Sequence, residues 1–244
     1  MINVWGLTDI GLVRKENQDA YHVCQSHGCT VCVVCDGMGG TAGGQLASKI
    51  AVETFAAELD KVLSEHMSPE QIREASSYAV SLANKAIRET AAKDEAYQNM
   101  GTTLVAAVAC GDKVVVSNVG DSRAYHISEN GIVRITKDHS LVESMVERGD
   151  ITEEEARHHP NRNLITRALG PDTAALCDGY IYPLAEGEYV LLCTDGLVDT
   201  VTDQEMLFEV IHGGAPDTCL ERLLEISKKR GARDNVTAVL LQKI

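Results

Sequence analysis

Aspartates stand where several short, apolar, strand-like runs of the chain begin or end. Asp36 follows VCVVC, Asp121 follows VVVSNVG and Asp195 follows YVLLCT. Asp234 lies just before VTAVLL, and Asp19 lies just before AYHVC. A single aspartate beside a glycine is usually a turn residue. Five aspartates at strand ends favour a different interpretation, in which their carboxylates converge on one site.

Converging carboxylates need a cation between them. Two such charges about 4 Å apart repel each other by about 4 kcal/mol at an effective dielectric constant of about 20. Carboxylate and carbonyl oxygens suit a hard ion, Mg²⁺ or Mn²⁺, that keeps several of its waters. Gly37 can add a backbone carbonyl because no side chain blocks the approach. Two ions about 3.5–4 Å apart would lower the pKa of a shared water and clamp an anionic substrate for in-line displacement.

An anionic substrate also needs a cationic side chain, and Arg14 is the candidate. Arg14 precedes Asp19 closely in the stretch RKENQD. Its guanidinium could therefore bind phosphate oxygens through two parallel hydrogen bonds while Asp19 and Asp36 hold metal.

The glycine-rich stretch DGMGG after the apolar run raises an alternative, a loop that cradles a dinucleotide. That fold requires a second parallel strand after the first helix, ending in an acid that binds ribose. Here the pattern predicts a second helix instead, and the charge of Asp36 would repel a pyrophosphate. No Gly-Lys-Ser/Thr follows either, so a nucleotide-binding P-loop is excluded as well.

Hydrophobic periodicity predicts the elements that must position these residues. Strands are expected near 2–8, 19–24 and 30–35, followed by helices near 44–65 and 69–95. A meander of antiparallel hairpins over 102–136 precedes a polar, helical insertion from His139 to Ala168. The remainder is predicted as strands at 178–182 and 188–193, helices at 203–212 and 216–230, and a last strand at 235–242. This order predicts an α+β fold of two antiparallel sheets covered by helices.

Composition limits the class of protein. The chain has 244 residues, of which 44% are hydrophobic, and no Pro- or Ser-rich linker divides it, so a single domain spanning 1–244 is expected. The net charge of −14 argues against binding to nucleic acid or an anionic membrane. Charged residues interrupt the N-terminal stretch early, so neither a signal peptide nor a membrane span is predicted, and a cytoplasmic location is expected.

Eight cysteines include the spacing C-x-x-C-x-x-C at Cys29, Cys32 and Cys35, which could suggest a zinc or redox site. Residues three apart on a strand point to opposite faces. Free cysteine is also among the most buried residue types. The sequence therefore favours reduced, buried thiols over a metal site.

Six motifs, in order and over nearly the whole chain, resemble the metal-dependent serine/threonine protein phosphatases of type 2C in their compact bacterial form. They are GLVRKENQDA, VCDGMGG, GTTLVAAVACGDKVVVSNVGDSRAY, ITKDHSLVESMVERGDITEEEARHHPNRNLITRALG, LLCTDGLVDTV and DNVTAVLL. The resemblance implies a four-layer α-β-β-α sandwich, with two antiparallel sheets flanked by helix pairs. It also implies a dinuclear Mn²⁺ or Mg²⁺ centre between the sheets that hydrolyses phosphoserine and phosphothreonine on proteins.

Carried over by position, the resemblance assigns a role to each candidate residue. Arg14 matches the arginine that binds the substrate phosphate, Asp36 the bridging ligand and Gly37 the carbonyl ligand. Asp195 and Asp234 match further ligands of the metal pair. Three assignments close the set: Asp19 reaching the metals through water, Asp121 with Asp195 holding a third, weaker ion, and residues 139–169 forming a flap over the site.

One position departs from the pattern of the animal relatives, because Met38 stands where they carry a histidine. A thioether cannot donate a proton, so we expect a metal-bound water to protonate the leaving alkoxide. His139, at the root of the insertion, is the alternative proton donor.

The sequence therefore predicts a monomeric phosphoprotein phosphatase that uses metal-activated water, forms no covalent enzyme intermediate and opposes a serine/threonine kinase. Two alternatives remain at this point. One is another two-metal hydrolase, such as a nuclease or nucleotidase, against which the acidic charge speaks. The other is a protein without activity, either a pseudophosphatase or a signal-binding module, which would have to lack metal ligands, whereas none is missing from this sequence.

Overall fold

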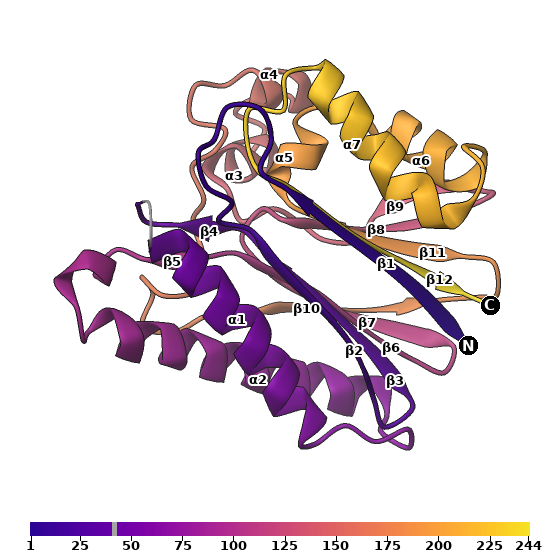
Figure 1. The fold of residues 1–244 in the computed structure, drawn as a ribbon, viewed down its shortest axis with the longest axis horizontal. Helices are drawn as coiled ribbons and strands as arrows, with labels where there is room; N and C mark the ends of the chain where they lie inside the picture. The colour runs from indigo at the N-terminus through magenta and orange to yellow at the C-terminus, as the bar shows by residue number, and fades with distance from the viewer. Residues whose placement is uncertain (41–42) are drawn as a thin grey trace.

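Two five-stranded antiparallel sheets lie face to face in the computed structural model, which describes residues 1–40 and 43–244 (Figure 1). The first sheet has the strand order β1-β12-β11-β8-β9. Its strands are β1 (Ile2–Asp9), β12 (Val236–Lys243), β11 (Tyr189–Cys193), β8 (Arg123–Ser128) and β9 (Gly131–Arg134).

The second sheet has the strand order β10-β7-β6-β3-β2. Its strands are β10 (Asp178–Pro183), β7 (Lys113–Val119), β6 (Leu104–Cys110), β3 (Cys29–Cys35) and β2 (Ala20–Ser26). A short pair, β4 (Gly37–Met38) and β5 (Gly101–Thr102), extends the ends of β3 and β6 beyond this sheet.

Helices cover the outer face of each sheet (Figure 1). The long helices α1 (Gly43–Asp60) and α2 (Pro69–Ala91) pack on the second sheet. The shorter helices α5 (Asp195–Val198), α6 (Asp203–Ile211) and α7 (Cys219–Lys229) pack on the first sheet. A third apolar core fills the space between the two sheets. The predicted α+β fold, a four-layer α-β-β-α sandwich, is confirmed.

Strand β3 shows how the sequence specifies these layers. Val31 and Val33 point into the core beneath α1 and α2, whereas Cys32 and Val34 point into the core between the sheets. Successive side chains of a strand point to opposite faces, and both faces of β3 are covered. Its sequence is therefore an unbroken apolar run.

Helix ends differ from the prediction by a few residues. The helix expected over 44–65 ends at Asp60, and the helix expected over 69–95 ends at Ala91, before a separate 3₁₀ turn at Glu95–Tyr97. The helix expected over 216–230 begins with a 3₁₀ turn at Pro216–Thr218. The start of α2 is sharply defined, because Ser68 and Gln71 form a reciprocal capping box there.

The predicted meander over 102–136 is wrong in one respect. Strands β6 and β7 form a hairpin in the second sheet, whereas β8 and β9 form a hairpin in the first. The chain crosses between the sheets at Gly120, which has φ +105° and leaves no room for a side chain, because a Cβ there would lie 2.6 Å from Thr103 Cγ2. Asp121 follows directly, in the connection between β7 of the second sheet and β8 of the first.

The expectation of reduced, buried thiols is also wrong for Cys29. Cys29 and Cys110 form a disulfide between β3 and β6, with their Cα atoms 4.6 Å apart. The antiparallel register pairs Thr30 with Ala109, so these two cysteines follow as the next opposing positions. The other six are free: Cys24, Cys32, Cys35, Cys177, Cys193 and Cys219.

The insertion folds into two short helices, α3 (Leu141–Glu147) and α4 (Glu153–Arg157). Arg134 on β9 donates to Glu143 at 2.9 Å, and Lys137 pairs with Glu147, so one ion pair joins α3 to the edge strand of the first sheet and another joins it to the segment after that strand. Within the two described ranges of the chain, no helix combines the length and apolarity needed to cross a membrane.

Candidate metal centre

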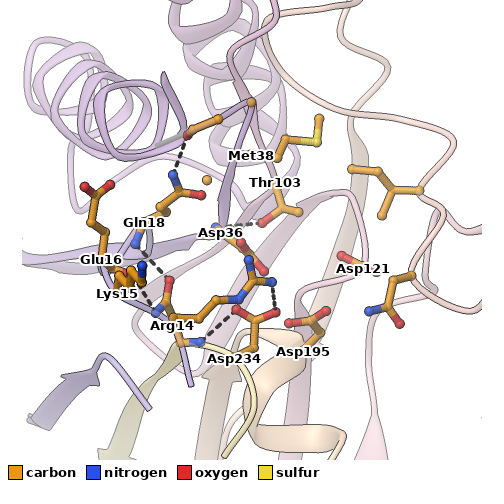
Figure 2. A pocket seen from close by; sticks show the side chains of 16 residues that line it. Arg14, Lys15, Glu16, Gln18, Asp36, Met38, Thr103, Asp121, Asp195 and Asp234 are labelled. Carbon is orange, nitrogen blue, oxygen red and sulfur yellow. Dashed lines mark hydrogen bonds and ion pairs between the residues drawn. The ribbon is translucent and has the colours of Figure 1, made fainter. Parts of the chain in front are cut away.

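The predicted site residues meet at one end of the sandwich, where strands of both sheets begin or end. Asp36 follows β3, Asp121 lies between β7 and β8, and Asp195 begins α5 just after β11. Asp234 lies just before β12. These four carboxylates line one pocket of about 510 Å³ together with Gly37 and Arg14, and their side chains point into it from both sheets (Figure 2).

Asp19 is the one predicted ligand that does not line the pocket. It is buried beside it, with 8% of its surface exposed, and the hydroxyl of Thr194 donates to its Oδ2 at 2.9 Å. A carboxylate in this place would act on an ion in the pocket through water, and this role of Asp19 stays a prediction.

Burial and mutual repulsion shift the acidity of this cluster. Burial raises the pKa of Asp36 well above its usual range, and the charges of Asp19 and Asp195 raise it further. Burial likewise raises the pKa of Asp19 to about 7 and that of Asp195 to about 6, with neighbouring aspartates adding to both. The pKa of Asp121 is raised by burial first and then by Asp195. In their charged form these groups require a compensating cation.

A hard divalent ion fits the donors of this pocket. The Oδ1 atom of Asp195 is buried without a hydrogen-bond partner among the described residues, although a buried polar atom is normally paired. Across the same residues, no three His, Cys, Asp or Glu side chains lie close enough together to hold an ion by themselves. Mg²⁺ and Mn²⁺ accept such an open arrangement, because one or two carboxylates and several waters can complete their coordination.

The backbone around Asp36 is fixed by hydroxyl groups from the neighbouring strands. The Asp36 N–H donates to Thr103 Oγ1 at 2.9 Å, and Thr102 Oγ1 donates to the Asp36 carbonyl at 2.8 Å. Thr103 Oγ1 also shares a hydrogen bond of 2.7 Å with Ser122 Oγ, directly after Asp121. One hydroxyl therefore links the segments that carry Asp36 and Asp121.

Gly37 is required by a close approach of backbone. A Cβ atom at this position would lie 2.1 Å from the Gly44 carbonyl oxygen and 2.5 Å from that of Gln18. No other residue fits between these two segments. The glycine thus brings the loop of Asp36 against the start of α1 and against the segment that follows Arg14.

Arg14 lies on the loop between β1 and β2, and its side chain is 53% exposed. Its Nη2 donates to Asp234 Oδ2 at 2.5 Å (Figure 2). The hydrogen bond to Asp234 raises the pKa of Arg14, and the charges of Asp36 and Asp195 contribute in the same direction. A guanidinium with one edge on the carboxylates and the other toward solvent can bind an incoming anion.

Met38 lines the pocket, whereas His139 does not. His139 Nδ1 accepts a hydrogen bond from the Gly120 N–H at 3.1 Å, which places the imidazole proton on Nε2, 3.1 Å from Asp178 Oδ2. Burial lowers the pKa of His139, although Asp178 opposes this shift. The histidine supports the crossing at Gly120, and its place outside the pocket counts against it as a proton donor.

Sequence reasoning missed several residues of the pocket. Thr103 and Asn235 line it, and Asn163 and Ile165 of the insertion contribute to its wall. A signal existed for Asn235, since it follows a predicted ligand directly. The two residues of the insertion carry no local signal, because only the fold brings them to the aspartates.

The chain resembles known phosphatases over its full length. The family profile described as "Protein phosphatase 2C" matches residues 13–240. The serine/threonine phosphatase Stp of Listeria welshimeri is 32% identical over 237 residues, which are 97% of this chain and 94% of that protein.

Solved structures agree with this match. The serine/threonine phosphatase of S. agalactiae superposes with a TM-score of 0.93 at 29% identity, covering 100% of both chains. The catalytic domain of the serine/threonine protein phosphatase PstP, in complex with two manganese ions, gives a TM-score of 0.85 at 30% identity and covers 99% of this chain and 97% of that one.

The chain belongs to the protein phosphatase 2C family, in its compact bacterial form. It is a protein serine/threonine phosphatase.

Proposed function

We propose that this phosphatase hydrolyses phosphoserine and phosphothreonine at a dinuclear Mn²⁺ or Mg²⁺ centre in the aspartate pocket. The observation that carries the proposal is the buried Oδ1 of Asp195, which has no hydrogen-bond partner among the described residues and lies in a pocket with three further aspartates. The PstP domain, a relative with two manganese ions, supports the number and kind of ions.

Each predicted ligand has a place in this proposal. Asp36 would bridge the two ions, the Gly37 carbonyl would add a ligand, and Asp195 and Asp234 would complete the pair from the first sheet. Asp19 would act on the ions through water. Asp121, together with Asp195, is proposed to hold a third and weaker ion.

The chain's own residues bind and orient the substrate. Arg14 binds the phosphate oxygens and holds the phosphate group at the aspartate pocket. Such a charged, hydrogen-bonded contact is worth about 1.5–3 kcal/mol. When bound, the ions supply Lewis acidity and lower the pKa of water enough to make a nucleophile at neutral pH. Met38 has no proton to give, so the proton for the leaving Ser or Thr oxygen is proposed to come from water in the pocket rather than from a side chain.

The domain organisation, oligomeric state, cellular location and opposing kinase also belong to the proposal. Residues 1–244 are proposed to act as one catalytic domain, with residues 139–169 as a flap that contributes Asn163 and Ile165 to the pocket wall. We infer that the enzyme is a cytoplasmic monomer that reverses the action of a serine/threonine kinase on shared protein substrates. Among the described residues that line the pocket none is aromatic, which argues against a nucleic-acid substrate bound by base stacking.

A single preparation tests the proposal. Purified protein stripped of metal is titrated with Mn²⁺ in a calorimeter and assayed on a phosphothreonine peptide at each metal concentration. We expect two tight binding events and a turnover that follows their occupancy. Undiminished turnover after removal of metal, or one ion per chain at full activity, would contradict the dinuclear centre.

A further inference from the structure

Asn235 lies directly beside the loop that carries Arg14. Residues 10–18 form nearly all of this loop, which joins β1 to β2, and these two strands belong to different sheets. Asn235 is 5% exposed, and its side-chain amide makes three hydrogen bonds, all to backbone groups of the loop. Nδ2 donates to the carbonyls of Ile10 and Glu16 at 3.0 Å each, and Oδ1 accepts from the Gln18 N–H at 2.9 Å.

The loop is held against the same segment by its backbone as well. The Leu12 N–H donates to the Ala232 carbonyl at 2.9 Å. Gly11, with φ +77°, passes so close that a Cβ there would lie 2.2 Å from the Asp234 carbonyl oxygen. The loop therefore has little freedom to move away from residues 232–235, and the amide of Asn235 spans both of its ends.

The backbone of Asn235 also forms a hydrogen bond with Asp234, which pairs with Arg14. The Asn235 N–H donates to Asp234 Oδ1 at 2.8 Å, while Arg14 donates to the other carboxylate oxygen. The backbone of Asn235 thus orients the carboxylate, and its side chain holds the loop from which the guanidinium extends. Asn235 therefore orients the Asp234 carboxylate and positions the loop of Arg14, the two members of this ion pair.

We propose that Asn235 is a positioning residue that places Arg14 over the metal centre for phosphate binding. The proposal rests on the proposed role of Arg14 as the phosphate ligand. Asparagine suits this task because one planar amide offers two donors and an acceptor, which neither aspartate nor leucine supplies in the same space.

The arrangement reaches the second sheet through Gln18. Its backbone N–H is bound by Asn235, its side chain donates to the Gly40 carbonyl at 2.6 Å, and its own carbonyl accepts from Ser48 Oγ at 2.6 Å. Gly40 belongs to the turn that follows Asp36, and Ser48 lies in α1. Asn235 therefore fixes the Arg14 loop relative to ligands from both sheets.

A double-mutant cycle tests whether Asn235 acts through Arg14. The variants are Asn235→Ala, Arg14→Ala and both together, assayed on a phosphothreonine peptide at saturating Mn²⁺. Each single change should raise KM about tenfold or more, with a smaller effect on kcat. In the Arg14→Ala background, Asn235→Ala should change KM less than about twofold, because the group that it positions is gone.

Asn84→Ala is the matched control. Asn84 is 3% exposed and its amide also bridges backbone groups, donating to the Asp172 carbonyl and accepting from the Gly170 N–H, away from the Arg14 loop. This variant should lose stability but keep the wild-type KM. Asn235→Ser repeats the cycle if the alanine variant does not fold.

Amide hydrogen exchange on metal-free protein gives a readout independent of turnover. Residues 10–18 should exchange faster in Asn235→Ala than in the wild type, and at the wild-type rate in Asn84→Ala. An unchanged KM in Arg14→Ala would overturn the role of Arg14 itself. A raised KM in Arg14→Ala with multiplicative effects in the double variant, or unchanged exchange over 10–18, would overturn the positioning role of Asn235 alone.

Discussion

The guanidinium of Arg14 lies 2.5 Å from the carboxylate of Asp234, a residue 220 positions further along the chain. One of these side chains is proposed to bind phosphate and the other to bind metal, so the two functions share a contact. An ion bound by Asp234 competes with Arg14 for the same carboxylate. Metal binding should therefore loosen the guanidinium and direct it toward the substrate.

Replacing Arg14 by alanine should weaken substrate binding more than catalysis. Loss of a charged, paired contact to phosphate should raise KM for a phosphothreonine peptide about tenfold to a hundredfold. Because a competing positive charge is removed from Asp234, Mn²⁺ should bind at least as tightly as in the wild type. Steady-state kinetics and calorimetry check the two effects, and weaker Mn²⁺ binding in this variant would contradict the competition.

Replacing Asp36 by asparagine should have opposite effects on activity and on the stability of the metal-free protein. Turnover should fall by orders of magnitude, because a proposed bridging ligand is lost. The melting temperature without metal should rise, because asparagine replaces a carboxyl group whose pKa is raised by burial first and by the neighbouring aspartates second. Asp217→Asn, at an exposed position, is the control that should change neither quantity. A fall in the metal-free melting temperature of Asp36→Asn would count against mutual repulsion in the pocket.

The stability of the metal-free protein should fall as the pH rises from about 5 to 8. The folded-state pKa of Asp19 is raised to about 7 and that of Asp195 to about 6, above their usual values near 4. The folded state therefore binds more protons than the unfolded state in this range, so deprotonation favours unfolding. Thermal unfolding in a series of buffers measures the effect.

Saturating Mn²⁺ provides the comparison for this pH series. The ions replace protons as the compensating charge, so the loss of stability between pH 5 and 8 should disappear or reverse. A metal-free melting temperature that rises steadily across this range would show that the aspartates are not protonated in the folded protein.

Thr194→Val should weaken metal binding from behind the pocket. The Thr194 hydroxyl donates to Asp19 Oδ2 at 2.9 Å, and such a hydrogen bond to a charged group is worth about 1.5–3 kcal/mol. Without it the pKa of Asp19 should rise further, and Mn²⁺ affinity near pH 7 should fall about tenfold. Thr194→Ser keeps the hydroxyl and should restore most of the affinity in a calorimetric titration. Equal losses in both variants would point to packing of the threonine methyl group instead.

Local patterns in the sequence were sufficient to predict the strands, the helix pairs and the aspartates at strand ends. Strand β3 is a case in point, because an apolar run that stops at Asp36 carries both its burial and its end in adjacent residues. The ends of α1 and α2 were less accurate, since caps such as Ser68 and turns depend on only a few side chains.

Features that depend on distant residues could not be predicted in the same way. Whether the strands after Gly120 join the first or the second sheet is decided by their packing against strands elsewhere in the chain. Cys29 and Cys110 are 81 residues apart, and only the register of β3 against β6 makes them neighbours. Asn235 bonds to Ile10 and Glu16, more than two hundred positions away.

The proposed ligands are divided between the two sheets, with Asp36 just after β3, Asp195 just after β11 and Asp234 just before β12. The apolar core between the sheets, which includes Val34 and Leu192, therefore determines the distance between the proposed ligands of one sheet and those of the other. A change in side-chain volume in this core would shift the aspartates of one sheet relative to those of the other, although the changed residue contacts no ion. Such variants should lose activity on warming before they unfold. The turnover rate of this phosphatase would then depend on how its two sheets are packed against each other.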